Sequence, residues 1–178
     1  MSTLMYIVDG YNVLHAVFPR IAADELAERR AWLVEQMAGL AAVRGASAVV
    51  VFDVRQRANE ACELVAGTAV EVCFAGGPYA ADAFIARRIA EQPPDVTVLV
   101  VSADQEVQRT AARAGVHRLT PRELSAELDL VRTEVEEVVA NGHDSVRMRS
   151  QLEDKVDVET LRKLERLRRE GAAPDGTT

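Results

Sequence analysis

Cysteine, histidine and aromatic residues are scarce in this sequence, with two cysteines, three histidines and 4% aromatics among 178 residues. The cysteines form no CxxC pair and no cluster with histidine, which argues against a zinc site. Cys62 and Cys73 each stand among apolar neighbours. We therefore expect them to be buried free thiols in a reducing compartment rather than a disulfide.

Several binding motifs are also missing. There is no GxGxxG run and no P-loop, so dinucleotide and nucleoside-triphosphate binding have little support. The start, MSTLMYIVDG, has no basic segment and no long apolar run, so we expect neither a signal peptide nor a membrane anchor, and a cytoplasmic location. The net charge of −7 argues against a simple basic DNA-binding module. It does not exclude nucleic acid, because bound metal reverses the local charge of an acidic site.

Apolar residues make up 48% of the chain, enough for one compact domain with a full core. Runs rich in Val and Ile do not alternate cleanly with polar residues, which is typical of strands buried on both faces. Helical patterns separate them, and this alternation predicts an α/β fold with a central parallel sheet and helices on both faces. The predicted strands are 5–8, 48–52, 69–74, 96–101 and 116–119, and the predicted helices between them are 24–43, 80–91 and 104–114.

The C-terminal part reads differently. Thr120, Pro121 and Glu123 form a helix start with an N-cap, a first-turn proline and a capping-box acid. An amphipathic helix should follow and end at Asn141-Gly142. We therefore expect a main domain over 1–142, a C-terminal helical extension over 143–170 that packs on it, and a disordered tail over 171–178. Within the extension, 143–155 is a charged connection, and apolar spacing from Val158 to Leu167 predicts a last helix.

Aspartates stand at the ends of the predicted strands. Asp9 and Asp53 end the first two strands, Asp104 follows the fourth by three residues, and Asp82 lies in the first turn of the helix after the third. Carboxyl ends of parallel strands share one edge of a sheet, where ligands of such folds bind. Clustered carboxylates repel unless a cation binds, and Mg²⁺ or Mn²⁺ takes oxygen ligands. Metal held in this way can activate water and neutralise charge growing on a phosphodiester.

Each aspartate also has an ordinary structural interpretation. A residue just after a strand is often a turn former or helix cap, and Asp82 fits a helix-start charge. Asp104 has a specific alternative, because Ser102 and Gln105 form a plausible capping box around it. The coincidence of acids at three or four strand ends favours the shared metal site.

Other side chains lie near these acids in the sequence. Asn12 is placed to hold a carboxylate or a metal-bound water, or to serve as a turn or cap residue. Arg55 and Arg57 follow Asp53 and are candidates for phosphate contacts, or for a solvated loop. Tyr11 and Tyr79 can stack on bases, although packing is the commoner use. His15 is nearest to the site, but no feature marks it as a general base.

The segment Ile7-Val8-Asp9-Gly10-Tyr11-Asn12-Val13 resembles the NYN family of PIN-like nucleases, and more narrowly the YacP-like group of ribosome-associated endoribonucleases. The resemblance runs from about residue 4 to 170. It also rests on the segments 51–53, 81–82, 101–104, 120–124 and 164–169. One departure stands out: the third acidic motif of the family usually reads Thr-Ala-Asp followed by an acid, whereas this chain has Ala80-Ala81-Asp82-Ala83. Fewer ligands imply weaker metal binding or a different outer shell.

The resemblance implies a PIN-like, Rossmann-like fold over 1–142 and a metal-dependent endoribonuclease acting on RNA, with ribosome-associated mRNA as a candidate substrate. Asp9, Asp82 and Asp104 are the first-choice ligands of Mg²⁺ or Mn²⁺, Asp53 is an auxiliary ligand, Asn12 orients the site, and Arg55 and Arg57 bind RNA. The alternative is a non-catalytic RNA- or ribosome-binding module that kept a weakened site. A metal-dependent phosphatase is a third hypothesis; an aspartyl-phosphate type would need a second aspartate where Tyr11 stands.

Overall fold

The computed structural model describes residues 3–54, 60–76, 80–104 and 115–153, and only the backbone of 142–153. Within those ranges the strands are β1 (Thr3–Asp9), β2 (Ser47–Val54), β3 (Ala61–Leu64), β4 (Val70–Gly76), β5 (Val96–Val101) and β6 (Val116–Leu119). The helices are α1 (Gly10–Val17), α2 (Leu26–Arg44), α3 (Ala80–Glu91) and α5 (Pro121–Glu153). The chain divides into two compact units, one over Met1–Arg132 and the other over Thr133–Thr178. Among the described helices, none is long and apolar enough to cross a membrane.

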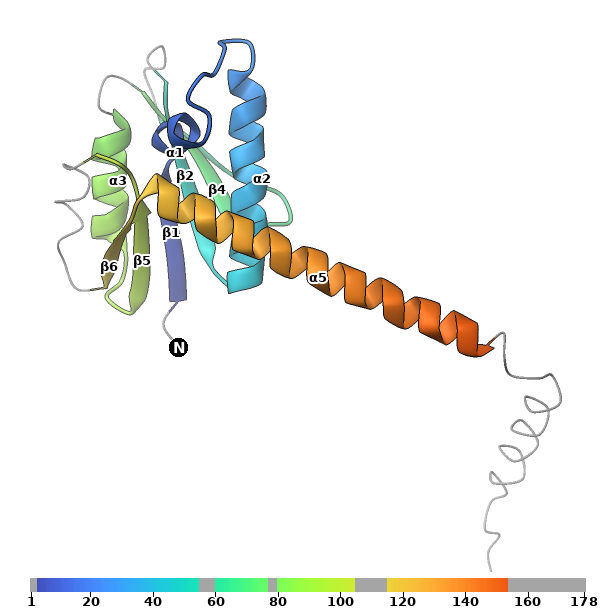
Figure 1. The fold of residues 1–178 in the computed structure, drawn as a ribbon. Helices are drawn as coiled ribbons and strands as arrows, with labels where there is room; N and C mark the ends of the chain where they lie inside the picture. The colour runs from blue at the N-terminus through green and yellow to red at the C-terminus, as the bar shows by residue number, and fades with distance from the viewer. Residues whose placement is uncertain (1–2, 55–59, 77–79, 105–114, 154–178) are drawn as a thin grey trace, which may run out of the picture. The chain divides into compact units, whose positions relative to one another are not determined.

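The strands form one sheet in the order β3-β4-β2-β1-β5-β6 (Figure 1). All five predicted strands are confirmed, and the pairs they make with one another are parallel. The central parallel sheet is thus confirmed, and one further strand that the sequence did not predict, β3, pairs antiparallel with β4 at the edge. Every residue of β3 is exposed, so this edge strand has no apolar run by which the sequence could reveal it.

Helices cover both faces of this sheet, as predicted. Helix α3 packs on one face, where Ala81, Phe84, Ile85 and Ile89 meet alternate residues of β1, β2, β4 and β5. Helices α1 and α2 and the start of α5 pack on the other face, around Tyr6, Val8, Val50 and Phe52. Because successive residues of a strand point to opposite faces, each central strand needs apolar residues at consecutive positions. This is why the Val- and Ile-rich runs of the sequence do not alternate.

Two helix predictions need correction. Gly10–Val17 forms helix α1, a segment in which the sequence indicated only a turn after the first strand. Asn141-Gly142 does not end the amphipathic helix that begins after Thr120, because α5 continues to Glu153 and takes in most of the expected charged connection. A glycine inside a helix costs only about 1 kcal/mol relative to alanine, so it weakens a helix without stopping it.

Two other predicted helices, 24–43 and 80–91, are confirmed as α2 and α3. The Thr120–Glu123 capping box is present: the Glu123 carboxylate accepts from Thr120 N at 2.7 Å, and the Thr120 hydroxyl accepts from Glu123 N at 3.2 Å. These hydrogen bonds lower the pKa of Glu123. The predicted helix over 104–114 lies outside the described residues after its first position, as do the last helix and the tail.

The prediction of two free thiols is wrong. Cys62 and Cys73 form a disulfide between β3 and β4, where they are register partners. Their Cα atoms are 4.1 Å apart, close to the separation of paired residues that exchange no backbone hydrogen bonds. Cys73 is fully buried as expected, whereas Cys62 is exposed on the edge strand. The error follows from the missed strand β3, since only that antiparallel pairing brings the two sulfur atoms together.

Gly10, directly after β1, lies so close to the ring of Phe52 that a larger residue would not fit. A Cβ atom at this position would overlap the ring of Phe52, which is fully buried in the core. We expect Gly10→Ala to lower the free energy of unfolding by about 1–3 kcal/mol, the usual cost of overpacking a core. Gly39→Ala is the matched control, because a Cβ there meets no atom within 4 Å. In the middle of α2 it should stabilise the protein by about 0.5–1 kcal/mol. Urea denaturation of both variants checks the two signs, and a neutral Gly10→Ala would contradict the close contact.

Candidate functional site

The strand order reverses beside β1. The chain passes from β1 to β2 on one side through α1 and α2, and returns through α3 to place β5 on the other side. In open α/β sheets, ligands bind outside the carboxyl ends of the strands at such a reversal. Asp9 is the last residue of β1, and Val8 pairs with Val101 at the end of β5. The carboxyl end of β1 is therefore the natural centre of a binding site.

Asp9 is a buried carboxylate with only 6% of its surface exposed. It caps α1, because its Oδ1 accepts from the backbone N of Asn12 at 3.2 Å. Its Oδ2 accepts from Asn12 Nδ2 at 2.5 Å, so a single asparagine orients both carboxylate oxygens. The sequence left open whether Asp9 is a cap or a ligand. The cap uses only part of the acceptor capacity of the carboxylate, which has about four lone-pair sites.

The ionisation of Asp9 reflects its neighbours. Burial raises the pKa of Asp9 above its ordinary value, and the hydrogen bonds from Asn12 oppose this shift. The negative charges of Asp104 and Asp53 raise the pKa of Asp9 further. Asp53 and Asp104, which lie far from Asp9 in the sequence, are thus close enough in the fold for their charges to act on it.

Asp53 contributes the second carboxylate. It lies two residues beyond Val51, the register partner of Asp9. Because side chains alternate along a strand, Asp9 and Asp53 both point to the face of the sheet that α3 covers. The Oδ1 atom of Asp53 is buried and has no hydrogen-bond partner among the described residues. A buried acceptor without a partner costs about 1–3 kcal/mol, more when it is charged, unless something binds there.

The end of β5 supplies Ser102 and Asp104. The Ser102 side chain is almost fully buried, with 1% exposed, and its Oγ accepts from the backbone N of Asp104 at 3.0 Å. This hydrogen bond shapes the turn that carries the exposed Asp104 out of the strand. We did not include Ser102 among the site residues from the sequence, although a lone hydroxyl at the end of an apolar strand was the available signal. Whether Gln105 completes a capping box lies outside the described residues.

Asp82 lies in the first turn of α3, which follows the carboxyl end of β4. The side chain is partly buried, and the next residue, Ala83, is exposed. Helix α3 contacts β1, β2 and β4, so its start lies at the same edge of the sheet as Asp9 and Asp53. Asp82 is not among the charges that shift the pKa of Asp9. The structure thus places Asp82 at the same edge of the sheet as Asp9 and Asp53.

The remaining candidates are not part of this cluster as described. Tyr11 packs edge-on against Phe52 with ring centroids 5.3 Å apart, so its observed use is packing. His15 is exposed on α1. Arg55, Arg57 and Tyr79 lie outside the described residues.

The donor set at this edge fits a hard divalent cation. All candidate ligands are carboxylate oxygens, which suit Mg²⁺ and Mn²⁺ better than soft metals. A cation would offset the charges of Asp53 and Asp104, which add to the burial that raises the pKa of Asp9, and it would give the buried Oδ1 of Asp53 a partner. The arrangement is therefore suited to chemistry in which negative charge develops, such as phosphodiester hydrolysis.

The sequence matches the YacP-like NYN domain over residues 6–169, which is most of the chain. The chain belongs to the YacP-like NYN domain family. This confirms the resemblance drawn from the first strand and its DGYN segment, and NYN domains form a PIN-like nuclease family. The match begins in β1 and takes in all four candidate aspartates.

Solved structures of a YacP-like NYN protein share this fold. One crystal structure of Rae1 (YacP) from Bacillus subtilis, a single-substitution variant, is 25% identical and has a TM-score of 0.65. The similarity covers 95% of this chain and 99% of that one. A second crystal structure of Rae1 (YacP) is 24% identical with the same TM-score of 0.65, covering 98% of this chain and 99% of the other. No curated protein matches the sequence.

Proposed function

We propose that this NYN domain is an endoribonuclease that hydrolyses RNA with a divalent metal, Mg²⁺ or Mn²⁺, held by its acidic cluster. One observation carries the proposal: the buried carboxylate of Asp9 lies near Asp104 and near Asp53, whose buried Oδ1 has no hydrogen-bond partner among the described residues. Keeping like charges together costs stability, and a catalytic cation is the most direct reason to do so.

The proposed roles follow from the placement of each side chain. Asp9, Asp53 and Asp104 hold the metal, with Asp82 completing the set from the start of α3. Asn12 keeps the Asp9 carboxylate in a fixed orientation through its two hydrogen bonds. Arg55 and Arg57, in the segment after Asp53, are assigned to RNA phosphates. When bound, the metal would supply an activated water and stabilise the negative charge on the phosphodiester.

The substrate class is part of the same proposal. We assign RNA as the partner, with ribosome-associated mRNA as the first candidate, and the cytoplasm as the location. Support for RNA comes from membership of a nuclease family and from the acidic site.

The direct test is cleavage of a structured RNA by the purified protein with Mn²⁺, with Mg²⁺ and with EDTA. We expect cleavage with either metal and none with EDTA, since the carboxylates alone repel the phosphate backbone. If the protein binds the RNA in a gel-shift assay but leaves it intact with both metals, the chain is a binding module and the nuclease proposal fails.

Ala83→Asp provides a second test through metal affinity. The substitution puts an acid beside Asp82 at an exposed position, so little packing should be disturbed. We expect isothermal titration of Mn²⁺ to show binding roughly tenfold tighter than in the parent, because one more anionic ligand or outer-shell acid is present. Ala86→Asp, one turn farther along α3, is the control and should leave the affinity unchanged. Absence of heat for both parent and Ala83→Asp would mean that the acidic cluster holds no metal.

A further inference from the structure

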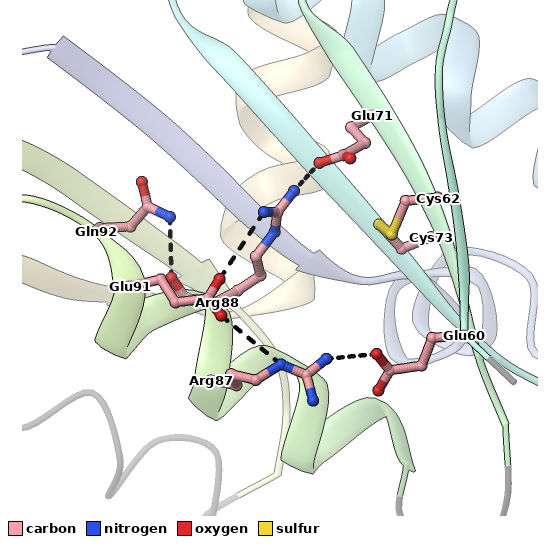
Figure 2. Close-up of polar contacts among 8 residues, drawn as sticks. All are labelled: Glu60, Cys62, Glu71, Cys73, Arg87, Arg88, Glu91 and Gln92. Carbon is pink, nitrogen blue, oxygen red and sulfur yellow. Dashed lines mark hydrogen bonds and ion pairs between the residues drawn. A yellow bond between two sulfur atoms is a disulfide. The ribbon is translucent and has the colours of Figure 1, made fainter.

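A second group of metal-ligating side chains lies on β3 and β4, and it is separate from the acidic cluster. Cys62, Glu71 and Cys73 place their Sγ and carboxylate oxygen atoms within 4.8 Å of one another. Glu71 and Cys73 are two residues apart on β4 and share one face, while Cys62 is the register partner of Cys73. Figure 2 shows this group beside α3, from which Arg87 and Arg88 reach toward the strands.

We propose that Cys62 and Cys73 are a reversible thiol–disulfide pair whose reduced form, together with Glu71, binds a thiophilic cation such as Zn²⁺. The disulfide form is the one in the structure, and it joins the edge strand β3 to β4. Reduction would convert this staple into a metal site with two sulfur ligands and one oxygen ligand. The proposal does not depend on the nuclease activity, because none of its residues belongs to the acidic cluster.

Zinc needs the two sulfur atoms farther apart than a disulfide holds them. Tetrahedral zinc with Zn–S bonds of about 2.3 Å holds its two sulfurs about 3.8 Å apart, so the sulfurs must separate after the S–S bond is broken. All three ligands come from neighbouring positions on two paired strands, so the backbone pairing of β3 and β4 keeps them near one another after reduction. The fourth position would be left to water, as in zinc sites with three protein ligands.

Arg88 competes with a metal ion for Glu71, the third ligand. Its guanidinium forms an ion pair with the carboxylate of Glu71, and its Nε is buried without a hydrogen-bond partner among the described residues. A cation arriving at Glu71 must replace Arg88 as the partner of that carboxylate. Arg88 has a second acid in reach, Glu91, whose carboxylate lies 3.9 Å away, so the displaced guanidinium keeps a partner.

The difference in exposure between the two cysteines decides which sulfur atom a reductant attacks. Cys62 is exposed and Cys73 is buried, so a thiolate from a dithiol reductant attacks Cys62 Sγ. The S–S bond breaks, Cys73 leaves as a thiolate, and the second sulfur of the dithiol then displaces Cys62. Two electrons and two protons pass to the protein sulfurs, and the reductant leaves as its own disulfide. Zinc binding then releases the two thiol protons to solvent.

Cobalt(II) is the probe that distinguishes this site from the acidic one. Thiolate ligands give Co²⁺ an intense near-ultraviolet charge-transfer band, whereas carboxylate ligands give none. We expect the fully reduced full-length protein to develop this band with one equivalent of Co²⁺ and to lose it when Zn²⁺ is added. Protein oxidised to the disulfide should show no such band, while its Mn²⁺ binding at the acidic cluster stays unchanged.

Three variants test the assigned ligands. Cys62→Ser, on an exposed strand, should abolish the band. Glu71→Gln should weaken Co²⁺ affinity by roughly tenfold or more, as changes around metal ligands do. Arg88→Gln should strengthen it, because the competing cation is gone. Far-ultraviolet circular dichroism of each variant checks that the fold is kept. If the reduced parent shows no charge-transfer band, or if Cys62→Ser keeps it, the proposal is overturned.

Discussion

Asp9→Asn is expected to abolish metal-dependent RNA cleavage, by roughly a thousandfold, while stabilising the metal-free protein near neutral pH. The loss of activity follows because the proposed central ligand of the metal is removed, and a bound metal supplies several kcal/mol of transition-state stabilisation. The gain in stability follows because a buried carboxylate beside two like charges is replaced by a neutral amide. Asparagine also caps helices well, so the start of α1 should survive the substitution.

The stability gained by Asp9→Asn should depend on pH. The folded-state pKa of Asp9 is raised above the ordinary value of 3.8, so the folded state keeps the proton to higher pH than the unfolded state. Protonated Asp9 therefore stabilises the folded state, and this stabilisation is fully present below the pKa of the unfolded state. It is lost as pH rises through the pKa of the folded state. The variant has no group to titrate, so the difference between the two proteins should widen with rising pH and then level off.

Thermal melts of the metal-free proteins from pH 3.5 to 8, together with the RNA cleavage assay, measure both effects. Asp95→Asn is a matched control, because Asp95 is exposed and lies before β5, at the amino-terminal edge of the sheet. It should leave cleavage unchanged. A pH-independent destabilisation by Asp9→Asn would show that the carboxylate serves α1 alone.

Reduction of the Cys62–Cys73 disulfide should lower the free energy of unfolding by about 3 kcal/mol, the chain-entropy value for a loop of this length. The bridge closes a separation of 11 residues and ties β3, whose residues are all exposed, to the rest of the sheet. For a domain of this size, the loss corresponds to a fall in melting temperature of about 10 °C. Melts with and without a dithiol reductant, in EDTA to keep the thiols metal-free, measure it.

Two serine variants separate the bridge from the burial of its sulfurs. Cys62→Ser should match the reduced parent, because that residue is exposed, and it should no longer respond to reductant. Cys73→Ser should lose about 1–3 kcal/mol more, since it buries a hydroxyl at a fully buried position. Equal melting temperatures for the reduced and the oxidised parent would mean that the disulfide does not stabilise the protein.

Local patterns in the sequence are enough to predict the central sheet, the helices that cover it and the edge at which the acids lie. Those features depend on local signals: buried strands must be apolar at consecutive positions, and amphipathic helices repeat every three to four residues. The DGYN segment after the first strand was also specific enough to predict the family that the sequence match then confirmed.

Tertiary structure alone decided which acids meet and which sulfurs bond. The charges of Asp53 and Asp104 act on Asp9 because β2 and β5 flank β1, and β5 reaches its place only because the chain returns through α3 to the far side of β1. The disulfide depends on β3, a strand held by backbone pairing to β4 with no buried side chain of its own. Cross-strand backbone pairing places few demands on side-chain type, so it leaves little trace in a single sequence. Contacts that depend on it appear only in the fold.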